Sequence, residues 1–239
     1  MKLLLHICCA NCGLVPIELL KSRTNADSAT AGQTGADNFP RKSALSLRGS
    51  ASIMLFWYNP NIHPAEEYEK RLVEVKKLAE IYHLPLIIGD YEKEKWFNLT
   101  KGLENEPEGG RRCEICFRMR LEKTAKMATQ FDYFSTTLGI SRYKNTDLIN
   151  QIGQELAKKY KIKFYPFIKI DQKDKKNVST YTTITNKNNA TKNYAIVNTD
   201  WAFQYELELS KKYNFYRQKY CGCIYSQKIN KNYKTAKPR

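Results

Sequence analysis

Short apolar runs alternate with longer amphipathic stretches along most of the chain. In residues 65–82 the apolar side chains recur at spacings of three and four, which places them on one face of a helix. The predicted strands cover residues 2–7, 53–57, 86–88, 133–137 and 163–165. The predicted helices cover residues 13–21, 65–82, 94–103, 111–128, a stretch beginning at 145 or 146, and 203–213. This alternation is typical of βαβ units, so we expect an α/β fold with a mainly parallel sheet of about five strands flanked by helices.

Two stretches, residues 22–52 and 173–193, break this pattern. The first is rich in Ser, Ala, Thr, Gly and Asn, the second is rich in Lys, Asn and Thr, and neither shows a period. Segments of this composition bury too little apolar area to offset the entropy of ordering them. We therefore expect a single α/β domain, residues 1–226, with two irregular insertions, followed by a basic polar tail, residues 227–239.

The chain is strongly basic, with 40 Lys and Arg residues against 24 Asp and Glu residues and a formal net charge of +16. This excess indicates a polyanionic partner and favours nucleic acid, even after the lysines of the tail and of the Lys/Asn-rich segments are discounted. No apolar run approaches the roughly 18 residues of a membrane span, and the first residues lack the pattern of a secretion signal. We therefore expect a cytoplasmic protein without membrane contact, whose thiols stay reduced.

Seven cysteines fall in three distant segments, Cys8-Cys9-x-x-Cys12, Cys113-x-x-Cys116 and Cys221-x-Cys223. The first segment follows the first predicted strand, at the sheet edge where α/β folds bind ligands. Four thiolates suffice for a [4Fe–4S] cluster, and the remaining three suit a second metal ion with an open position. Because Cys8 and Cys9 are adjacent, we expect them to face different ligands. Spacing alone also allows a structural zinc site or thiol redox chemistry.

Further motifs accompany the cysteines. They are His6-x-Cys8-Cys9-Ala10-Asn11-Cys12, Tyr58-Asn59-Pro60-Asn61-Ile62-His63-Pro64, Glu67-Tyr68 with Arg71, Gly89-Asp90-Tyr91, Arg112-Cys113-Glu114-Ile115-Cys116-Phe117-Arg118-Met119-Arg120-Leu121, Thr136-Thr137-Leu138 with Ser141 and Lys144-Asn145, and Tyr216-Arg217-Gln218 before Tyr220-Cys221-Gly222-Cys223. Together they resemble the QueH-type epoxyqueuosine reductases over most of residues 1–226, the two insertions excepted. Asn11 and Arg142 depart from the resemblance, because the family commonly has proline at both places.

The resemblance implies a fold related to the adenine-nucleotide α-hydrolase-like (PP-loop or HUP) domains, although the chain has no Ser-Gly-Gly-x-Asp-Ser signature and gives no reason to expect ATP. It implies an iron–sulfur oxidoreductase that reduces epoxyqueuosine to queuosine in the anticodon loop of tRNA. This activity would use no cobalamin and would draw electrons from an external donor. The expected cofactors are a [4Fe–4S] cluster and a nearby second ion, iron or zinc.

The resemblance also guides the assignment of residues. All seven cysteines, Cys8, Cys9, Cys12, Cys113, Cys116, Cys221 and Cys223, are expected metal ligands. Cys113, Cys116 and Cys221 are expected to bind the cluster with one of Cys8 and Cys9, and the other of that pair is expected to bind the second ion with Cys12 and Cys223. The candidate catalytic residues are Cys9, Cys12, His63 and Asp90. His63 is a candidate for proton transfer or substrate contact, and Asp90 for substrate binding or helix capping.

Two functions of other classes remain as alternatives at this point: a zinc-stabilised RNA-binding module without catalysis, and a tRNA-thiolating enzyme. Basic residues near the motifs are expected to contact tRNA phosphates: Arg71, Arg111, Arg112, Arg118, Arg120, Arg142, Lys144 and Arg217. The competing interpretation is that they form surface ion pairs with neighbouring Glu residues. Gln218, beside Arg217, is expected either to read a base edge or to brace the last cysteine loop.

Overall fold

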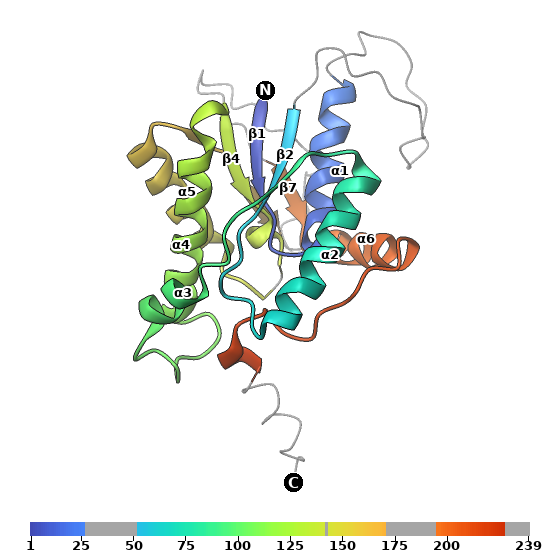
Figure 1. The fold of residues 1–239 in the computed structure, drawn as a ribbon. Coiled ribbons are helices and arrows are strands. Elements are labelled where there is room, and N and C mark those ends of the chain that lie inside the picture. Colours follow the sequence, from blue (N-terminus) through green and yellow to red (C-terminus); the bar gives the residue numbers. More distant parts are fainter. Residues whose placement is uncertain (27–51, 142, 171–194, 228–239) are drawn as a thin grey trace.

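The computed structural model describes residues 1–26, 52–141, 143–170 and 195–227. Its main sheet has five parallel strands in the order β3-β2-β1-β4-β5 (Figure 1). The strands are β1 (Lys2–His6), β2 (Ser52–Trp57), β3 (Leu86–Ile88), β4 (Tyr133–Thr136) and β5 (Lys163–Phe164). The structure therefore confirms the predicted parallel sheet and each of its five strands within a few residues.

Helices cover both faces of this sheet. They are α1 (Ala10–Ala26), α2 (Ala65–Tyr82), α3 (Lys93–Thr100), α4 (Arg111–Met127), α5 (Thr146–Tyr160) and α6 (Thr199–Lys212), with the short 3-10 helices η1 (Ala128–Gln130) and η2 (Thr137–Ile140). Helices α1, α2 and α6 lie on one side of the sheet, and α3, α4 and α5 lie on the other (Figure 1). The result is a three-layer α/β/α arrangement.

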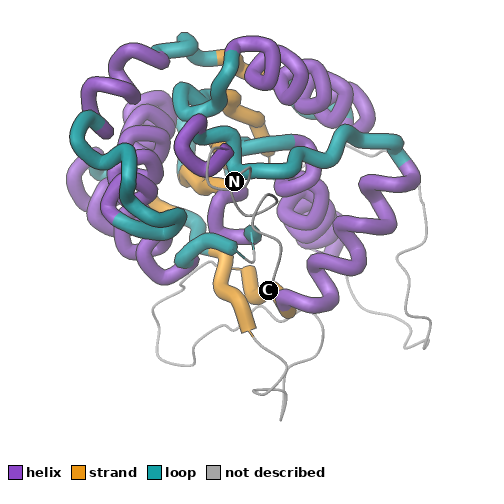
Figure 2. Tube along the Cα trace, turned by 90° about the horizontal axis from the view of Figure 1, so that it is seen from below, coloured by secondary structure: helices purple, strands orange, loops and turns teal. Residues whose placement is uncertain are grey.

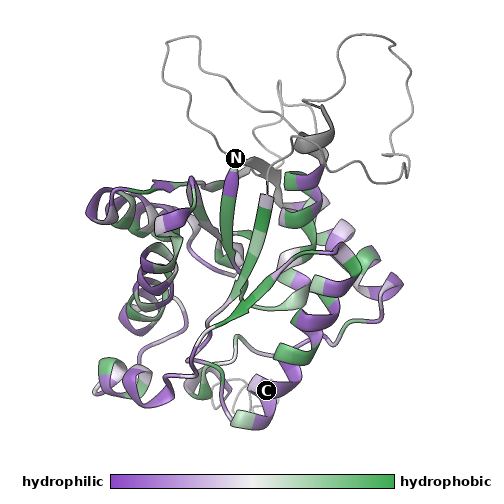
Figure 3. Ribbon diagram, turned by 45° about the horizontal axis from the view of Figure 1, so that its top comes forward, coloured by the Kyte–Doolittle hydropathy of each residue, from purple (hydrophilic) through white to green (hydrophobic). Residues whose placement is uncertain are grey.

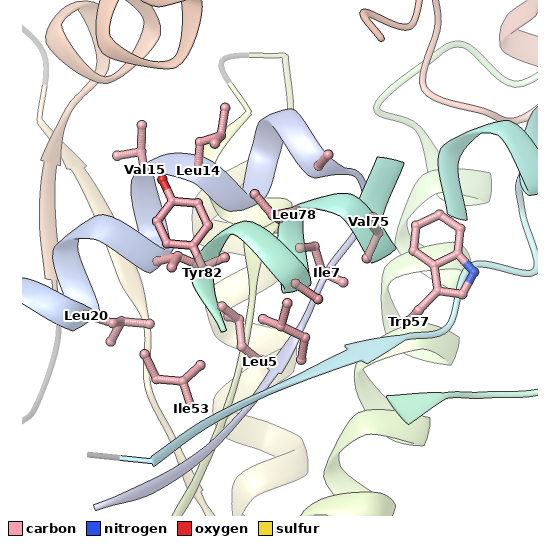
Figure 4. Packing of buried hydrophobic residues seen from close by; sticks show 14 of the residues in the cluster. Leu5, Ile7, Leu14, Val15, Leu20, Ile53, Trp57, Val75, Leu78 and Tyr82 are labelled. Atoms are coloured by element: carbon pink, nitrogen blue, oxygen red, sulfur yellow. The ribbon is translucent and has the colours of Figure 1, made fainter. Parts of the chain in front are cut away.

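The central strand β1 is buried on both faces. Leu3, Leu4 and Leu5 are all fully buried, and because successive strand side chains point to opposite faces they serve two cores. Leu5 packs with residues of α1 and α2, such as Leu14 and Leu78 (Figure 4). Leu4 belongs to the core beneath α4 and α5. In Figure 3 the paired strands are coloured mainly as hydrophobic, while the helices alternate between the two colours.

The strand order reverses at β1. Strands β2 and β3 add on one side of it, after which the chain crosses back through α3 and α4 and adds β4 on the other side. The connections that leave the carboxyl ends of β1 and β4 therefore diverge and open a crevice, which is where doubly wound sheets bind ligands. Seen from below in Figure 2, loops gather around this edge of the sheet.

The predicted insertions need correction at their boundaries. Helix α1 continues to Ala26, so residues 22–26 are helical and the predicted insertion does not start at residue 22. Helix α1 contacts α2 and α6, and Lys21, the last residue of the predicted helix, donates from Nζ to the carbonyl of Tyr82 at 2.9 Å. Tertiary contacts of this kind outweigh weak helix propensity.

The remainder of the first insertion, residues 27–51, lies outside the described residues, as do residues 171–194 and 228–239. Two strands that the sequence did not predict, β6 (Phe167–Ile170) and β7 (Ala195–Asn198), flank the second insertion and pair in parallel as a separate small sheet. No helix within the described ranges is long and apolar enough to cross a membrane.

Candidate metal centre

All seven cysteines line one cavity of about 50 Å³. They reach it from the β1–α1 connection and the first turn of α1, from the first two turns of α4, and from the loop that follows α6. Other residues of the cavity wall include Glu108, Arg120, Lys144 and Gln218. The convergence of three distant cysteine segments at the carboxyl edge of the sheet, predicted from the sequence, is confirmed.

The first group of sulfurs forms where β1 ends. Cys8 is held by Thr137, which follows β4: Thr137 Oγ1 accepts from the Cys8 backbone N–H at 3.0 Å and donates to Cys8 Sγ at 3.3 Å. The backbone N–H of Cys12 donates to Cys9 Sγ at 3.3 Å, across the first turn of α1. As a result the sulfurs of Cys8, Cys9 and Cys12 all lie within 4.8 Å of one another.

This geometry brings the sulfurs of Cys8 and Cys9 close together, and whether the two bind different ligands stays a prediction. In an extended strand, neighbouring side chains would point to opposite faces. Strand β1 ends at His6 and helix α1 starts at Ala10. Cys8 and Cys9 therefore lie in the turn between them, where alternation no longer applies.

Helix α4 supplies the second group. Gly109 N–H donates to Cys113 Sγ at 3.2 Å, and the Arg120 guanidinium approaches Cys116 Sγ at 3.9 Å. A hydrogen bond to the side-chain oxygen of Asn59 holds that guanidinium in place. Burial raises the pKa of the Cys113 thiol to about 11 and also raises that of Cys116. Without metal, both side chains are neutral thiols.

The loop that carries Cys221 and Cys223 is tied to the start of α2. Gly222 between them has φ +106°, and its carbonyl accepts from the His63 backbone N–H at 2.8 Å. Arg71 donates to the carbonyl of Tyr220 at 3.0 Å and to Glu67 at 2.7 Å. These contacts fix the loop against the protein and direct both sulfurs into the cavity.

Hydrogen bonds between thiols lower the pKa of two of the cysteines, Cys8 and Cys221. Bonds from Cys12 and Cys9 hold the pKa of Cys8 well below its usual range, against the effect of burial. A bond from Cys223 does the same for Cys221. The pKa values of the cysteines that donate these bonds rise. For Cys9, the bond with Cys12 lowers the pKa, but Cys8 and burial outweigh it and raise the pKa to about 12. Metal binding through these sulfurs releases protons, because the bound form of each ligand is the thiolate.

The donor set fits metal ions of soft character. A tetrahedral ion with metal–sulfur bonds of about 2.3 Å separates its thiolates by about 3.8 Å, which is compatible with the close packing of Cys8, Cys9 and Cys12. The thiolates of a cluster bind different iron atoms and therefore stand farther apart. Cations in the wall, among them Arg120 and Lys144, offset the negative charge that such a centre brings.

Comparison with known proteins reveals relatives along the whole chain. The epoxyqueuosine reductase QueH of Acinetobacter baylyi is 35% identical over 240 residues, which cover 100% of this chain and 86% of the relative. The enzyme of the same name from Thermotoga maritima is 36% identical over 176 residues, covering 72% of this chain and 77% of the relative. The sequence model of the epoxyqueuosine reductase QueH family matches residues 41–181 and 170–229.

The chain belongs to the epoxyqueuosine reductase QueH family. It is therefore a reductase that acts on a modified nucleoside of tRNA, and membership disfavours the RNA-binding module and the thiolating enzyme as alternatives. Among solved structures, the U34-tRNA thiolase NcsA from Methanococcus maripaludis with its [4Fe-4S] cluster is similar, with a TM-score of 0.46 and 14% identity, covering 100% of this chain and 68% of that one.

The structure does not bring His63 or Asp90 into the cysteine cavity of this QueH-family chain. His63 is buried against Phe97 and Trp96, with ring centroids 4.5 and 5.0 Å away. Burial lowers its pKa to about 4. The side chain of Asp90 is 88% exposed and lies 3.9 Å from Lys123 Nζ. It caps no helix, because α3 begins with Glu92 at its N-cap position.

Several of the expected phosphate-binding arginines serve the fold instead. Arg71, Arg112 and Arg120 are almost fully buried, and Arg112 donates to the carbonyls of Leu103 and Glu106 at 2.8 and 2.6 Å. Two others form ion pairs: Arg118 with Glu155 at 2.9 Å and Arg217 with Glu206 at 2.7 Å. Arg111 is exposed, and Arg142 lies outside the described residues.

Sequence reasoning missed Glu108 as a residue of the site. It lines the cavity, and burial together with the nearby charge of Cys221 raises the pKa of its carboxyl. The signal was present in the turn Glu108-Gly109-Gly110 directly before the cysteines of α4. Glycines at a helix start allow close approach of the backbone, and Gly109 N–H does contact Cys113 Sγ.

Proposed function

We propose that this chain converts epoxyqueuosine to queuosine within tRNA by a cobalamin-independent, two-electron reductive deoxygenation. The observation that supports this most is the convergence of seven cysteines on one cavity at the carboxyl ends of β1 and β4. We further propose that the chain holds a [4Fe–4S] cluster and a second metal ion, iron or zinc, and that it acts on tRNA in the cytoplasm.

The grouping of sulfurs supports an assignment that differs from the one expected from the sequence. We assign Cys8, Cys9 and Cys12 to the second ion, because their sulfurs lie within 4.8 Å of one another. Three protein ligands leave a fourth position open, as in catalytic metal sites. The cluster then takes the four remaining thiolates: Cys113, Cys116, Cys221 and Cys223. The charge of Cys221 acts on both Cys113 and Cys116, which supports one shared site.

The reaction breaks both carbon–oxygen bonds of the epoxide, takes up two electrons and two protons, and leaves an alkene and one water. When bound, the cluster supplies electrons and the second ion polarises the epoxide oxygen as a Lewis acid. An external donor must deliver both electrons. It is either a two-electron reductant or a one-electron reductant that acts twice.

Lys144 supports this chemistry from the cavity wall. Burial disfavours its charge, but the charges of Cys8, Cys12 and Cys221 outweigh burial and raise its pKa. The side chain therefore remains an ammonium. We assign Lys144 the role of stabilising the negative charge that develops on the epoxide oxygen as its first carbon–oxygen bond breaks. This effect is strong where water is excluded. Because His63 and Asp90 lie outside the cavity, the proposal gives neither a proton-transfer role.

Recognition of tRNA requires the modified base to leave its stack and enter the cavity. The anticodon loop is single-stranded, which makes this displacement cheaper than in a duplex. Tyr143 lines the cavity and is 77% exposed, so it offers an aromatic surface at the entrance. Exposed cations such as Arg111 would contact phosphates, and binding should then weaken with salt.

The test uses protein purified without oxygen. Iron and acid-labile sulfide are quantified, and the spectrum is expected to show broad absorption near roughly 400 nm. The protein is then given tRNA that carries epoxyqueuosine together with a chemical reductant, and the nucleosides are identified by mass spectrometry. We expect queuosine to appear only with protein and reductant present. Protein that contains zinc but no iron would contradict the proposed cluster.

A further inference from the structure

Two N–H groups point at the sulfur of Cys9. One is the backbone N–H of Cys12, at 3.3 Å, and the other is the side-chain amide of Gln218, whose Nε2 lies 2.9 Å from Cys9 Sγ. The first contact follows from the turn of α1 itself. The second joins residues 209 positions apart in the sequence, so it depends on how the segment after α6 is held.

Neighbouring groups determine which end of the Gln218 amide faces the sulfur. The Tyr216 carbonyl can only accept a hydrogen bond, so the Asn11 atom that faces it at 2.9 Å is the donor Nδ2. The same Nδ2 lies 3.4 Å from Gln218, whose atom there is therefore the acceptor Oε1. The other end of the Gln218 amide, Nε2, must then face Cys9.

Asn11 is itself fixed from its other side. Ser210 on α6 donates from Oγ to Asn11 Oδ1 at 2.9 Å, and both Asn11 and Ser210 are buried. A chain of hydrogen bonds, buried at its α6 end and half-buried at Gln218, therefore runs from α6 through two amides to a cysteine sulfur. Reversing either amide would set two donors or two acceptors against each other, which is costly in a buried site.

We propose that Gln218 is a positioning residue of the metal centre, held by Asn11 so that it donates a hydrogen bond to the sulfur of Cys9. The inference rests on the proposed binding of the second ion by Cys8, Cys9 and Cys12. An N–H donor withdraws electron density from a thiolate, and partners of this kind tune bound metals. A metal ion bound through Cys9 is then a stronger Lewis acid than it would be without Gln218.

Co²⁺ is a suitable probe, because it binds sulfur ligands like those of zinc and iron and its thiolate complexes show a sulfur-to-metal charge-transfer band. The protein is loaded anaerobically with Co²⁺, and bound metal is quantified alongside the spectrum. In Gln218→Leu the sulfur loses its donor, so we expect unchanged Co²⁺ content and a band shifted to longer wavelength. Asn11→Ala releases the Gln218 amide, and we expect a smaller shift in the same direction.

Gln151→Leu is the matched control, because Gln151 is exposed on α5, where its amide donates to Glu155 at 3.0 Å. Its band should coincide with that of the parent protein. If Gln218→Leu does not fold or take up Co²⁺, then Gln218→Glu replaces it, since a carboxylate of similar shape has no hydrogen to donate. Equal band positions in the parent and in the Gln218 variants, at equal loading, would overturn the inference. Failure of the parent protein to bind any metal would instead overturn the proposed function.

Discussion

Gly222, between Cys221 and Cys223, offers a sharp test of how the last cysteine loop is built. Its φ of +106° is one that side-chain-bearing residues rarely adopt, and forcing alanine into such a region costs about 1–3 kcal/mol. A Cβ at this position would also meet the Ile62 side chain at 2.8 Å and the Arg71 guanidinium at 3.0 Å. Overpacking of this kind costs about 1–3 kcal/mol more.

The expected loss for Gly222→Ala is therefore about 2–6 kcal/mol of the free energy of unfolding. Gly102→Ala isolates the backbone contribution, because Gly102 has φ +82° but a Cβ there would have no heavy atom within 4 Å. Replacing Gly with Ala reduces the entropy of the unfolded chain equally in both variants, so this effect cancels when their unfolding free energies are compared. The difference between them should be about 1–3 kcal/mol, with Gly222→Ala the less stable.

Urea unfolding followed by the fluorescence of buried Trp57 and Trp96 measures both variants. Metal content should fall in Gly222→Ala, since the clash displaces Cys221 and Cys223, and should stay unchanged in Gly102→Ala. Equal unfolding free energies for the two variants would refute the reasoning, because the contacts with Ile62 and Arg71 would then add nothing.

The remaining predictions concern pH and metal ligands. Burial lowers the pKa of His63 to about 4, so as pH falls this histidine takes up its proton in the unfolded chain before it does so in the folded one. The free energy of unfolding should therefore drop by about 2 kcal/mol between pH 8 and 5. Unfolding curves of His63→Gln should lose that part of the pH dependence, whereas those of His83→Asn, altered at an exposed histidine, should keep it. Cys12→Ser should retain cluster iron and lose the second ion, whereas Cys116→Ser should lose the cluster iron; metal analysis showing the same loss in both would argue against two separate sites.

The sheet was predictable from sequence because burial on both faces leaves a continuous apolar run, as in Leu3-Leu4-Leu5. The strands β6 and β7 could not be predicted from sequence, since each is only four residues long and lies beside a Lys/Asn-rich segment. Short strands are specified by their partner, and the partner is not visible in a local pattern.

The convergence of the cysteine segments was predictable from sequence, whereas the close approach of the Cys8, Cys9 and Cys12 sulfurs was not. Parallel strands bring their carboxyl ends to one edge, which explains why three distant segments could be expected to meet. Which sulfurs lie close together depends on the turn at Cys8 and Cys9. It also depends on Thr137, whose hydrogen bonds to Cys8 join the end of β4 to the end of β1. Asp90 followed a strand end as well, but β3 is an edge strand, so its end lies away from the crevice between β1 and β4.

The measurement that tests the central claim most directly is nucleoside analysis of tRNA from cells with and without the gene. The account predicts that epoxyqueuosine accumulates and queuosine disappears when the gene is absent. It further predicts that the intact gene restores queuosine, whereas a gene encoding Cys9→Ser does not. Unchanged queuosine in cells that lack the gene and have no other epoxyqueuosine reductase would contradict it.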